Sequence, residues 1–203
     1  DAAAQVAHAI SVHAVENESD YYTAVDDRIE DDETGAGMIG TVEFNSATLY
    51  RYAALDVDLL RKNLGAGLRE DEPVTEPLRR AVEAFVRGFI ESLPTGKINT
   101  FGNHTLPDAV IVKLRTSRPI SFVGAFEEPV MLGSGYLQEA SGRLADYIPE
   151  VERAYGVVGD TDTWVLRVGR STEKLSGLGT ELPLPALVAA VGAAVAQRPV
   201  PAK

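Results

Sequence analysis

The chain has no cysteine and only three histidines among its 203 residues. Without cysteine it has no disulfide framework and no thiolate metal site. His8 and His13 are five positions apart, so on a strand they face opposite sides and cannot share a metal ion. His104 has no histidine or cysteine near it in the sequence. We therefore expect no bound metal and no other cofactor.

Long hydrophobic runs are also missing. The longest apolar stretch, Leu182 to Ala196, contains prolines and is too short to span a bilayer. The first residues do not place a basic segment before an apolar one, which is the pattern of a secretory signal. Together with the lack of cysteine, these features predict a cytoplasmic protein without a membrane partner.

Positive charge is scarce: 19 Lys and Arg residues stand against 30 Asp and Glu residues, for a net charge of −11. Taken alone, this balance argues against nucleic acid, because phosphate binding normally requires a basic surface. Part of the excess is local, since the segment from Asp20 to Glu33 is rich in acids and has a single arginine. Such a run is typical of a solvated loop. Any nucleic-acid function must therefore be argued from individual residues.

Catalytic signatures are absent as well. The sequence has no Gly-x-Ser-x-Gly nucleophile motif and no Walker loop. Asp26-Asp27 is an adjacent carboxylate pair, but it lies in the acidic run, where side chains usually face solvent. We therefore predict that the protein is not an enzyme and has no catalytic residues.

One glycine pattern supplies an alternative to that prediction. Gly35-x-Gly37-x-x-Gly40 has the dinucleotide-binding spacing, which requires a buried strand before the first glycine and a helix after the last. Acids come before Gly35 instead, and the residues after Gly40 alternate as a strand does. The context argues against a nucleotide-binding enzyme built on Gly35 to Gly40, which stays as the alternative.

Hydrophobic periodicity predicts an α+β fold. Strands are predicted over residues 6–14, 41–57, 109–115 and 163–168, the second of them bent near Asn45-Ser46. Helices are predicted over 58–64, 76–93, 135–155 and 185–196. This order is typical of a modified RNA-recognition or ferredoxin-like sheet with helices on one face. Such a domain normally begins with one more strand and helix, which we expect to be missing before Asp1.

Two groups of residues are candidates for ligand binding. The polar loop 95–105 contains Lys97, Asn99, Thr100 and Asn103, and such side chains bind phosphates and sugars. The other group stands at the two ends of the acidic run, as Tyr21-Tyr22 and Met38-Ile39. These residues either pack on each other and pin the loop or form a platform that stacks or wedges bases. The sequence leaves both interpretations open.

Several segments, taken in combination, resemble the repeated backbone subunit of the type I-E CRISPR Cascade complex, the CasC-type family. They cover most of residues 5–137. The matching segments are Ala7-His8-Ala9-Ile10-Ser11-x-His13, Asp20-Tyr21-Tyr22-Thr23-Ala24-Val25-Asp26-Asp27, Gly40-Thr41-x-Glu43-Phe44-Asn45-Ser46, Tyr50-Arg51-Tyr52, Asn63-Leu64-Gly65, residues 97–108, Ala125-Phe126-Glu127 and Pro129-Val130.

The resemblance implies a non-catalytic subunit that binds guide (CRISPR) RNA along its backbone and supports recognition of a target DNA strand in antiviral defence. Its further partners would be neighbouring copies of itself and other Cascade subunits. The implied RNA-binding residues are Tyr21, Tyr22, Thr23, Met38 and Ile39, with Lys97, Thr100 and their loop near the guide backbone. A generic interaction domain, whose aromatic side chains only pack, is the remaining alternative.

The resemblance also implies a domain organisation. Residues 1–170 are expected to form the C-terminal portion of a palm-like RNA-recognition-type domain, with residues 15–40 as an acidic inserted loop. Residues 171–203 are expected to form a C-terminal helix and tail. The family's first strand, basic guide-contacting helix and thumb are expected ahead of Asp1.

Overall fold

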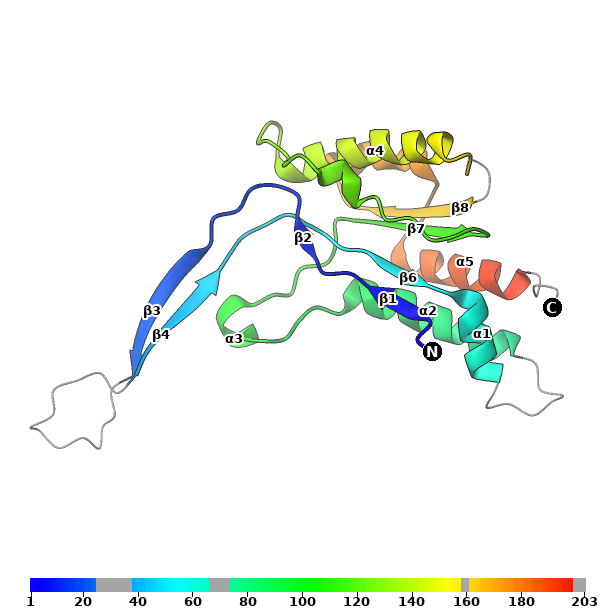
Figure 1. Cartoon of the computed structure of the whole chain (residues 1–203), viewed down its shortest axis with the longest axis horizontal. Helices are drawn as coiled ribbons and strands as arrows, with labels where there is room; N and C mark the ends of the chain where they lie inside the picture. Colours follow the sequence, from blue (N-terminus) through cyan, green and yellow to red (C-terminus); the bar gives the residue numbers. More distant parts are fainter. Residues whose placement is uncertain (25–37, 66–73, 158–160, 199–203) are drawn as a thin grey trace, which may run out of the picture.

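A computed structural model of the chain describes residues 1–24, 38–65, 74–157 and 161–198, and it has the α+β fold that the sequence predicts (Figure 1). Over these residues the strands lie in several small sheets. All four predicted helices are present. They are α1 (Val57–Gly65), α2 (Thr75–Glu91), α4 (Tyr136–Ala154) and α5 (Leu184–Gln197).

The centre of the molecule is an antiparallel strand pair that helices cover on both faces. β7 (Ala109–Arg115) pairs with β8 (Thr161–Arg167), and the short β9 (Thr180–Glu181) runs parallel to β8. Figure 1 shows α4 on one side of this pair and α5 with α2 on the other. The prediction that helices cover only one face is therefore wrong. Cover on both faces explains why the β7 sequence is apolar at successive positions instead of alternating.

The main hydrophobic core lies between this sheet, α2 and α5. Its buried members include Leu78 and Val82 of α2, Trp164 of β8, and Leu187 and Val191 of α5. The helix beyond residue 170 thus shares its core with α2, and the expected domain division at that position stays a prediction. The 3-10 helix η2 (Arg170–Leu178) leads from β8 back over α4.

The two long strands expected over 6–14 and 41–57 are each interrupted. β1 (Ala4–Val6) pairs with β6 (Ala53–Leu55), and β2 (Ile10–Ser11) pairs with β5 (Leu49–Tyr50). The predicted bend at Asn45-Ser46 lies in the gap before β5, where the ladder stops. The two segments therefore form a bent ribbon whose pairing breaks where the chain changes direction.

A second apolar cluster attaches this bent ribbon, at the end formed by β2 and β5, to α4. Its buried members are Val12, Val130, Ala140 and Phe126, the last from the 3-10 helix η1 (Val123–Phe126). The Val130 N–H donates to the Val12 carbonyl at 2.8 Å. The position of α4 therefore also sets the position of the ribbon.

Two polar side chains strengthen the same attachment. The His13 ring stacks on Tyr136 with 3.7 Å between centroids, and its Nε2 accepts the Thr48 N–H at 3.1 Å. The sequence predicts His13 as a strand residue, but it lies in the bend after β2. The Tyr50 hydroxyl accepts the Phe122 N–H at 3.1 Å.

Two findings concern only the residues that the structure describes, 1–24, 38–65, 74–157 and 161–198. None of the helices there is both long enough and apolar enough to cross a membrane. The same residues contain no group of three or more His, Asp or Glu side chains arranged to hold a metal ion.

The shared core predicts that α5 is needed for stability. Leu187 is fully buried, so Leu187→Ala should lower the free energy of unfolding by about 2–5 kcal/mol through lost burial and a residual cavity. Urea unfolding measures this change. The exposed Ala189→Ser on the same helix is the control and should change stability by less than about 0.5 kcal/mol. Equal effects of the two substitutions would show that α5 does not belong to the core.

Tyr50 predicts a loss of stability at alkaline pH. Burial raises the pKa of Tyr50, against the opposing effect of hydrogen bonds with Ser121 and Phe122. The folded protein then holds the phenol proton more tightly than the unfolded chain does. This contribution to stability is present below pH 10.0 and is lost as the pH rises through the raised pKa. Unfolding of Tyr50→Phe should therefore depend less on pH in that range than unfolding of the wild type. Tyr155→Phe, at an exposed tyrosine, should keep the wild-type profile.

Candidate functional site

The acidic segment forms a projecting β-ribbon in its described parts. β3 (Glu18–Ala24) and β4 (Met38–Phe44) are antiparallel and extend away from the body (Figure 1). This corrects the expectation of a loop over residues 15–40, while residues 25–37 lie outside the described residues, Asp26-Asp27 among them. Each strand has seven residues, so the paired part is roughly 20 Å long. Glu18 and Asp20 concealed the strand because they leave β3 without an apolar face.

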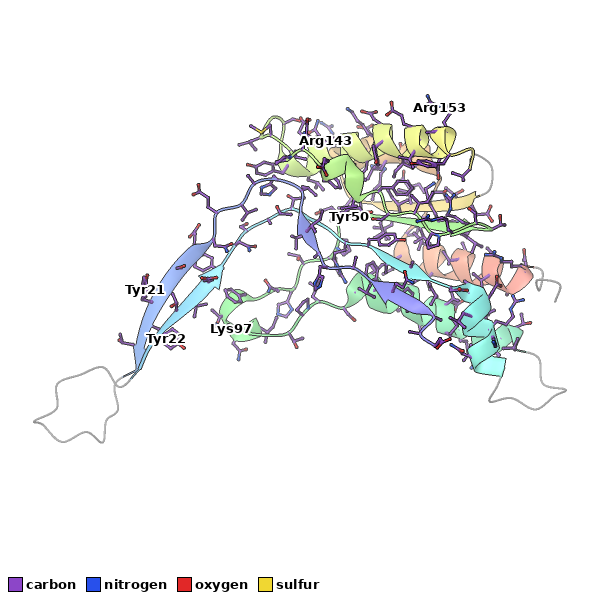
Figure 2. The ribbon with its side chains drawn as sticks, viewed as in Figure 1. Tyr21, Tyr22, Tyr50, Lys97, Arg143 and Arg153 are labelled. Carbon is purple, nitrogen blue, oxygen red and sulfur yellow. The ribbon has the colours of Figure 1, made fainter. Side chains whose placement is uncertain are left out.

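The strand register brings together the residues that the sequence placed at the two ends of the acidic run. Tyr22 is opposite Gly40, Thr23 is opposite Ile39, and Ala24 is opposite Met38. Tyr21 and Tyr22 are consecutive on β3, so their side chains point to opposite faces of the ribbon. Figure 2 shows the two rings on opposite sides of the strand.

Tyr22 lies across the ribbon over Gly40. A Cβ atom at Gly40 would overlap the phenol ring of Tyr22, so glycine is the residue that leaves room for it. Gly40 lies within β4 and not at the start of a helix, as a dinucleotide site requires. Gly35 and Gly37 lie outside the described residues. Gly40 therefore seats an aromatic ring, a role that its spacing in the sequence did not reveal.

The two tyrosines differ in what they leave accessible. Tyr21 is 74% exposed, whereas Tyr22 is 45% exposed because its ring covers Gly40. Packing within the ribbon therefore covers part of the Tyr22 side chain and little of the Tyr21 side chain. Glu18, Asp20 and Glu43 are exposed on the same ribbon and would repel phosphate. The chemistry of the ribbon therefore suits stacking on bases better than contact with a nucleic-acid backbone.

The predicted polar loop contains a single helical turn, α3 (Ile98–Phe101). Ile98 and Phe101 are half-buried, and the intervening Asn99 and Thr100 are exposed. The two apolar side chains thus hold the turn on the body while the two polar ones face solvent. Asn103 follows the turn and is also exposed.

Lys97 is held in a strained backbone conformation at the start of α3. Its φ of 52° and ψ of 34° lie in the left-handed region, and no other non-glycine residue in the described ranges has a positive φ. A non-glycine residue there costs about 1–2 kcal/mol. Its carbonyl accepts the N–H groups of Thr100 and Phe101 at 2.9 and 3.1 Å, which fixes the turn. Strain of this kind concentrates at functional positions.

An open pocket of about 360 Å³ adjoins this loop. It lies between the C-terminal end of α2 and residues 103–106, and Asn103 and His104 are among the residues that line it. The sequence presented His104 only as a possible metal ligand. The pocket could not be found from the sequence because its two walls are separated by α3.

The ribbon and the α3 loop lie at the same end of the molecule (Figures 1 and 2). Figure 2 labels Tyr21 and Tyr22 on the ribbon and Lys97 beside α3. Within the described residues no hydrogen bond or ion pair joins the two elements. The predicted residues therefore form two groups, one aromatic and one polar with a cation.

Comparisons with known proteins agree on the kind of protein to which this chain is similar. A model of the family described as CT1975-like protein matches residues 1–190. A chain of a solved "CRISPR RNA-guided surveillance complex, pre-nicking" is 35% identical with a TM-score of 0.80, over 96% of this chain and 50% of that one. A chain of a solved "CRISPR RNA-guided surveillance complex" is 34% identical with a TM-score of 0.79, over 95% of this chain and 70% of that one.

The present chain thus spans about half the length of the first of these structures. No curated protein matches the sequence. The predicted resemblance to a subunit of a CRISPR surveillance complex is confirmed. Its narrower assignment to the type I-E backbone subunit stays a prediction.

The contact of Tyr22 with Gly40 predicts how the ribbon responds to substitution. Gly40→Ala should displace the ring and speed hydrogen exchange of the β3 and β4 amides by up to about fivefold, since cross-strand pairs contribute up to about 1 kcal/mol. Adding Tyr22→Ala should remove most of that effect, because the clash then disappears. Thr41→Ala, at the neighbouring exposed position, is the control. Additive effects of Gly40→Ala and Tyr22→Ala would contradict the contact.

Proposed function

The chain belongs to the CT1975-like protein family, and we propose that it acts as a non-catalytic backbone subunit of a CRISPR surveillance complex. In this role it binds guide RNA along its backbone and supports recognition of a target DNA strand in antiviral defence. The observation that carries the proposal is the similarity, over nearly the whole chain, to a chain of an RNA-guided surveillance complex.

The geometry of the two residue groups supports contacts with different parts of the RNA, one group with the backbone and the other with a base. Lys97 supplies a cation, and Asn99, Thr100 and Asn103 supply neutral donors, which is the chemistry of phosphate and sugar contacts. Tyr21 supplies an exposed ring on a strand surrounded by acids, which is suited to a base and not to a phosphate. Lys97 would then provide a local cation for a phosphate although the chain as a whole is acidic.

The projecting ribbon serves as an arm in this proposal. β3 and β4 form an element that extends beyond the body (Figure 1). Such an arm can place Tyr21 and Thr23 against RNA that lies beside a neighbouring copy. Met38 and Ile39 belong to the same arm through their backbone pairing with Ala24 and Thr23.

The proposed partners are guide RNA, the target DNA strand, neighbouring copies of the chain and other subunits of the complex. The proposed compartment is the cytoplasm. These assignments are proposed for the whole protein. This chain covers 50% and 70% of the two matched chains.

Neither alternative from the sequence has a specific observation in its favour. The nucleotide-binding enzyme requires a helix after Gly40, where the chain continues as β4. The generic interaction domain accounts for Tyr22, which is partly packed on Gly40, but leaves the exposed Tyr21 and the strained Lys97 without a role.

Substitution of Lys97 tests the proposed RNA contact. The affinity of the full chain for labelled single-stranded RNA should fall as salt rises from about 50 to 200 mM, because phosphate contacts release counterions. Lys97→Gln should weaken binding and reduce the slope of log affinity against log salt by about 0.7, the value for one phosphate contact on a single strand. Fluorescence anisotropy measures both quantities.

Two variants serve as controls for this measurement. Lys97→Arg should keep the slope, and Lys62→Gln, which removes an exposed cation from α1, should leave affinity and slope unchanged. The proposed contact is wrong if Lys97→Gln leaves both affinity and slope unchanged, or if binding is tight and insensitive to salt.

A further inference from the structure

We propose that the loop over residues 127–135, which joins η1 to α4, is a docking site for a protein partner with an apolar face bordered by Lys or Arg side chains. This docking site goes beyond the proposed function, because it is a second surface that contacts protein and needs no RNA. Figure 1 shows the loop extending outward ahead of α4.

Two neighbouring apolar side chains on this loop face solvent. Met131 is 77% exposed and Leu132 is 70% exposed. Single exposed apolar side chains are common on protein surfaces, whereas two adjacent ones with so little cover form a patch that a partner can bury. Among the described residues, the other adjacent pair of exposed large apolar side chains is Tyr21 and Tyr22, and Tyr22 is partly covered by its contact with Gly40.

The fold holds the loop in place on both sides of this exposed pair. Before the pair, Val130 is buried in the second apolar cluster, and its N–H donates to the Val12 carbonyl at 2.8 Å. After the pair, the Ser134 hydroxyl donates to Glu139 Oε1 at 2.7 Å. A loop that is already fixed loses little conformational entropy on binding, which favours association through the exposed pair.

The loop is negatively charged at its start. Arg143 of α4 donates to the backbone carbonyls of Glu128 and Pro129, the second at 3.2 Å, and so supports this part of the loop. The side chains of Glu127 and Glu128 are exposed. Within residues 1–24, 38–65, 74–157 and 161–198, neither carboxylate forms an ion pair. Both are therefore available to cations of a partner.

This charge favours a basic protein over other partners. The loop contains no Lys or Arg, so a nucleic-acid backbone would meet the two carboxylates without a cation to offset them. In a two-fold contact between copies of the chain, the carboxylates of each copy would approach those of the other, and the net charge of −11 adds to this repulsion. A face with Lys or Arg around apolar side chains complements both the carboxylates and the exposed pair.

A designed helical peptide tests this chemistry directly. Its leucines form one face and its lysines border that face, while two control peptides replace either every lysine by glutamate or every leucine by glutamine. The leucine–lysine peptide should shift the amide resonances of residues 127–135 in the isotopically labelled full chain, and the control peptides should not. No shift with the leucine–lysine peptide, or equal shifts with the leucine–glutamate peptide, would overturn the proposal.

Substitutions in the loop separate this site from a general attraction between a basic peptide and an acidic chain. Met131→Ser combined with Leu132→Ser should weaken peptide binding about tenfold or more, since the apolar area that the peptide buries is lost. Glu127→Gln combined with Glu128→Gln should weaken binding and reduce its dependence on salt. Leu49→Ser, at an exposed leucine elsewhere, is the control and should bind as the wild type does. An equal loss with Leu49→Ser, or no loss with the double serine variant, would show that the loop is not the docking site.

The RNA measurement keeps the docking site separate from the proposed function. Because Met131 and Leu132 are exposed, the double serine variant should melt with the wild type and keep its RNA affinity and salt slope. If Lys97→Gln weakens RNA binding as expected and the leucine–lysine peptide does not bind, the docking site is wrong and the proposed function stands. If the peptide binds at the loop and Lys97→Gln changes neither RNA affinity nor slope, the docking site stands and the proposed contact of Lys97 is wrong.

Discussion

The covering of β7 and β8 on both faces is the constraint from which the rest of the structure follows. The face toward α4 contains Lys113, whose Nζ lies 2.8 Å from Glu152 and 3.0 Å from Thr163 Oγ1. Arg115 shares the same carboxylate at 3.4 Å. Buried cations need such partners, so the pairing of these side chains with Glu152 sets where α4 lies on the sheet. The opposite face is apolar and is covered by α5 and α2.

The position of α4 determines where the β3–β4 ribbon leaves the body of the molecule. Val130, just before α4, bonds to Val12 at the root of the ribbon, and Tyr136 of α4 stacks on His13. The Arg198 side chain, after α5, donates to the Arg115 carbonyl at 2.7 Å and so ties the other helical layer to the same strand. The arm is thus aligned by contacts made at its base, which leaves its own surface available for a partner.

Periodicity in the sequence was sufficient for the helices and for β7 and β8, because their apolar faces are selected by burial. It was insufficient for β3, where Glu18 and Asp20 conceal a strand that is stabilised by pairing and not by burial. The contact of Tyr22 with Gly40 depends on the register of β3 against β4. Residues 25–37 separate the two strands in the sequence, so no local pattern reveals this register. The pocket depends on contact between elements on either side of α3, which no local motif specifies. The sequence correctly predicts that Lys97 lies in a polar loop. Its left-handed backbone could not be predicted, because glycine is the residue that normally adopts that conformation.

The two-residue repeat of the β3–β4 ladder also limits how the arm can vary among related proteins. Adding one residue to each strand beyond Tyr22 would lengthen the arm by about 3.4 Å and keep every pair below it in place. Removing a single residue from one strand between Glu18 and Tyr22 would instead move Tyr22 off Gly40 and exchange the faces on which the two tyrosines lie. Reach can therefore change by paired insertions near the tip, whereas an unpaired change near the root would need a β-bulge to preserve the register. The arm can be adjusted in length independently of the orientation of its aromatic side chains.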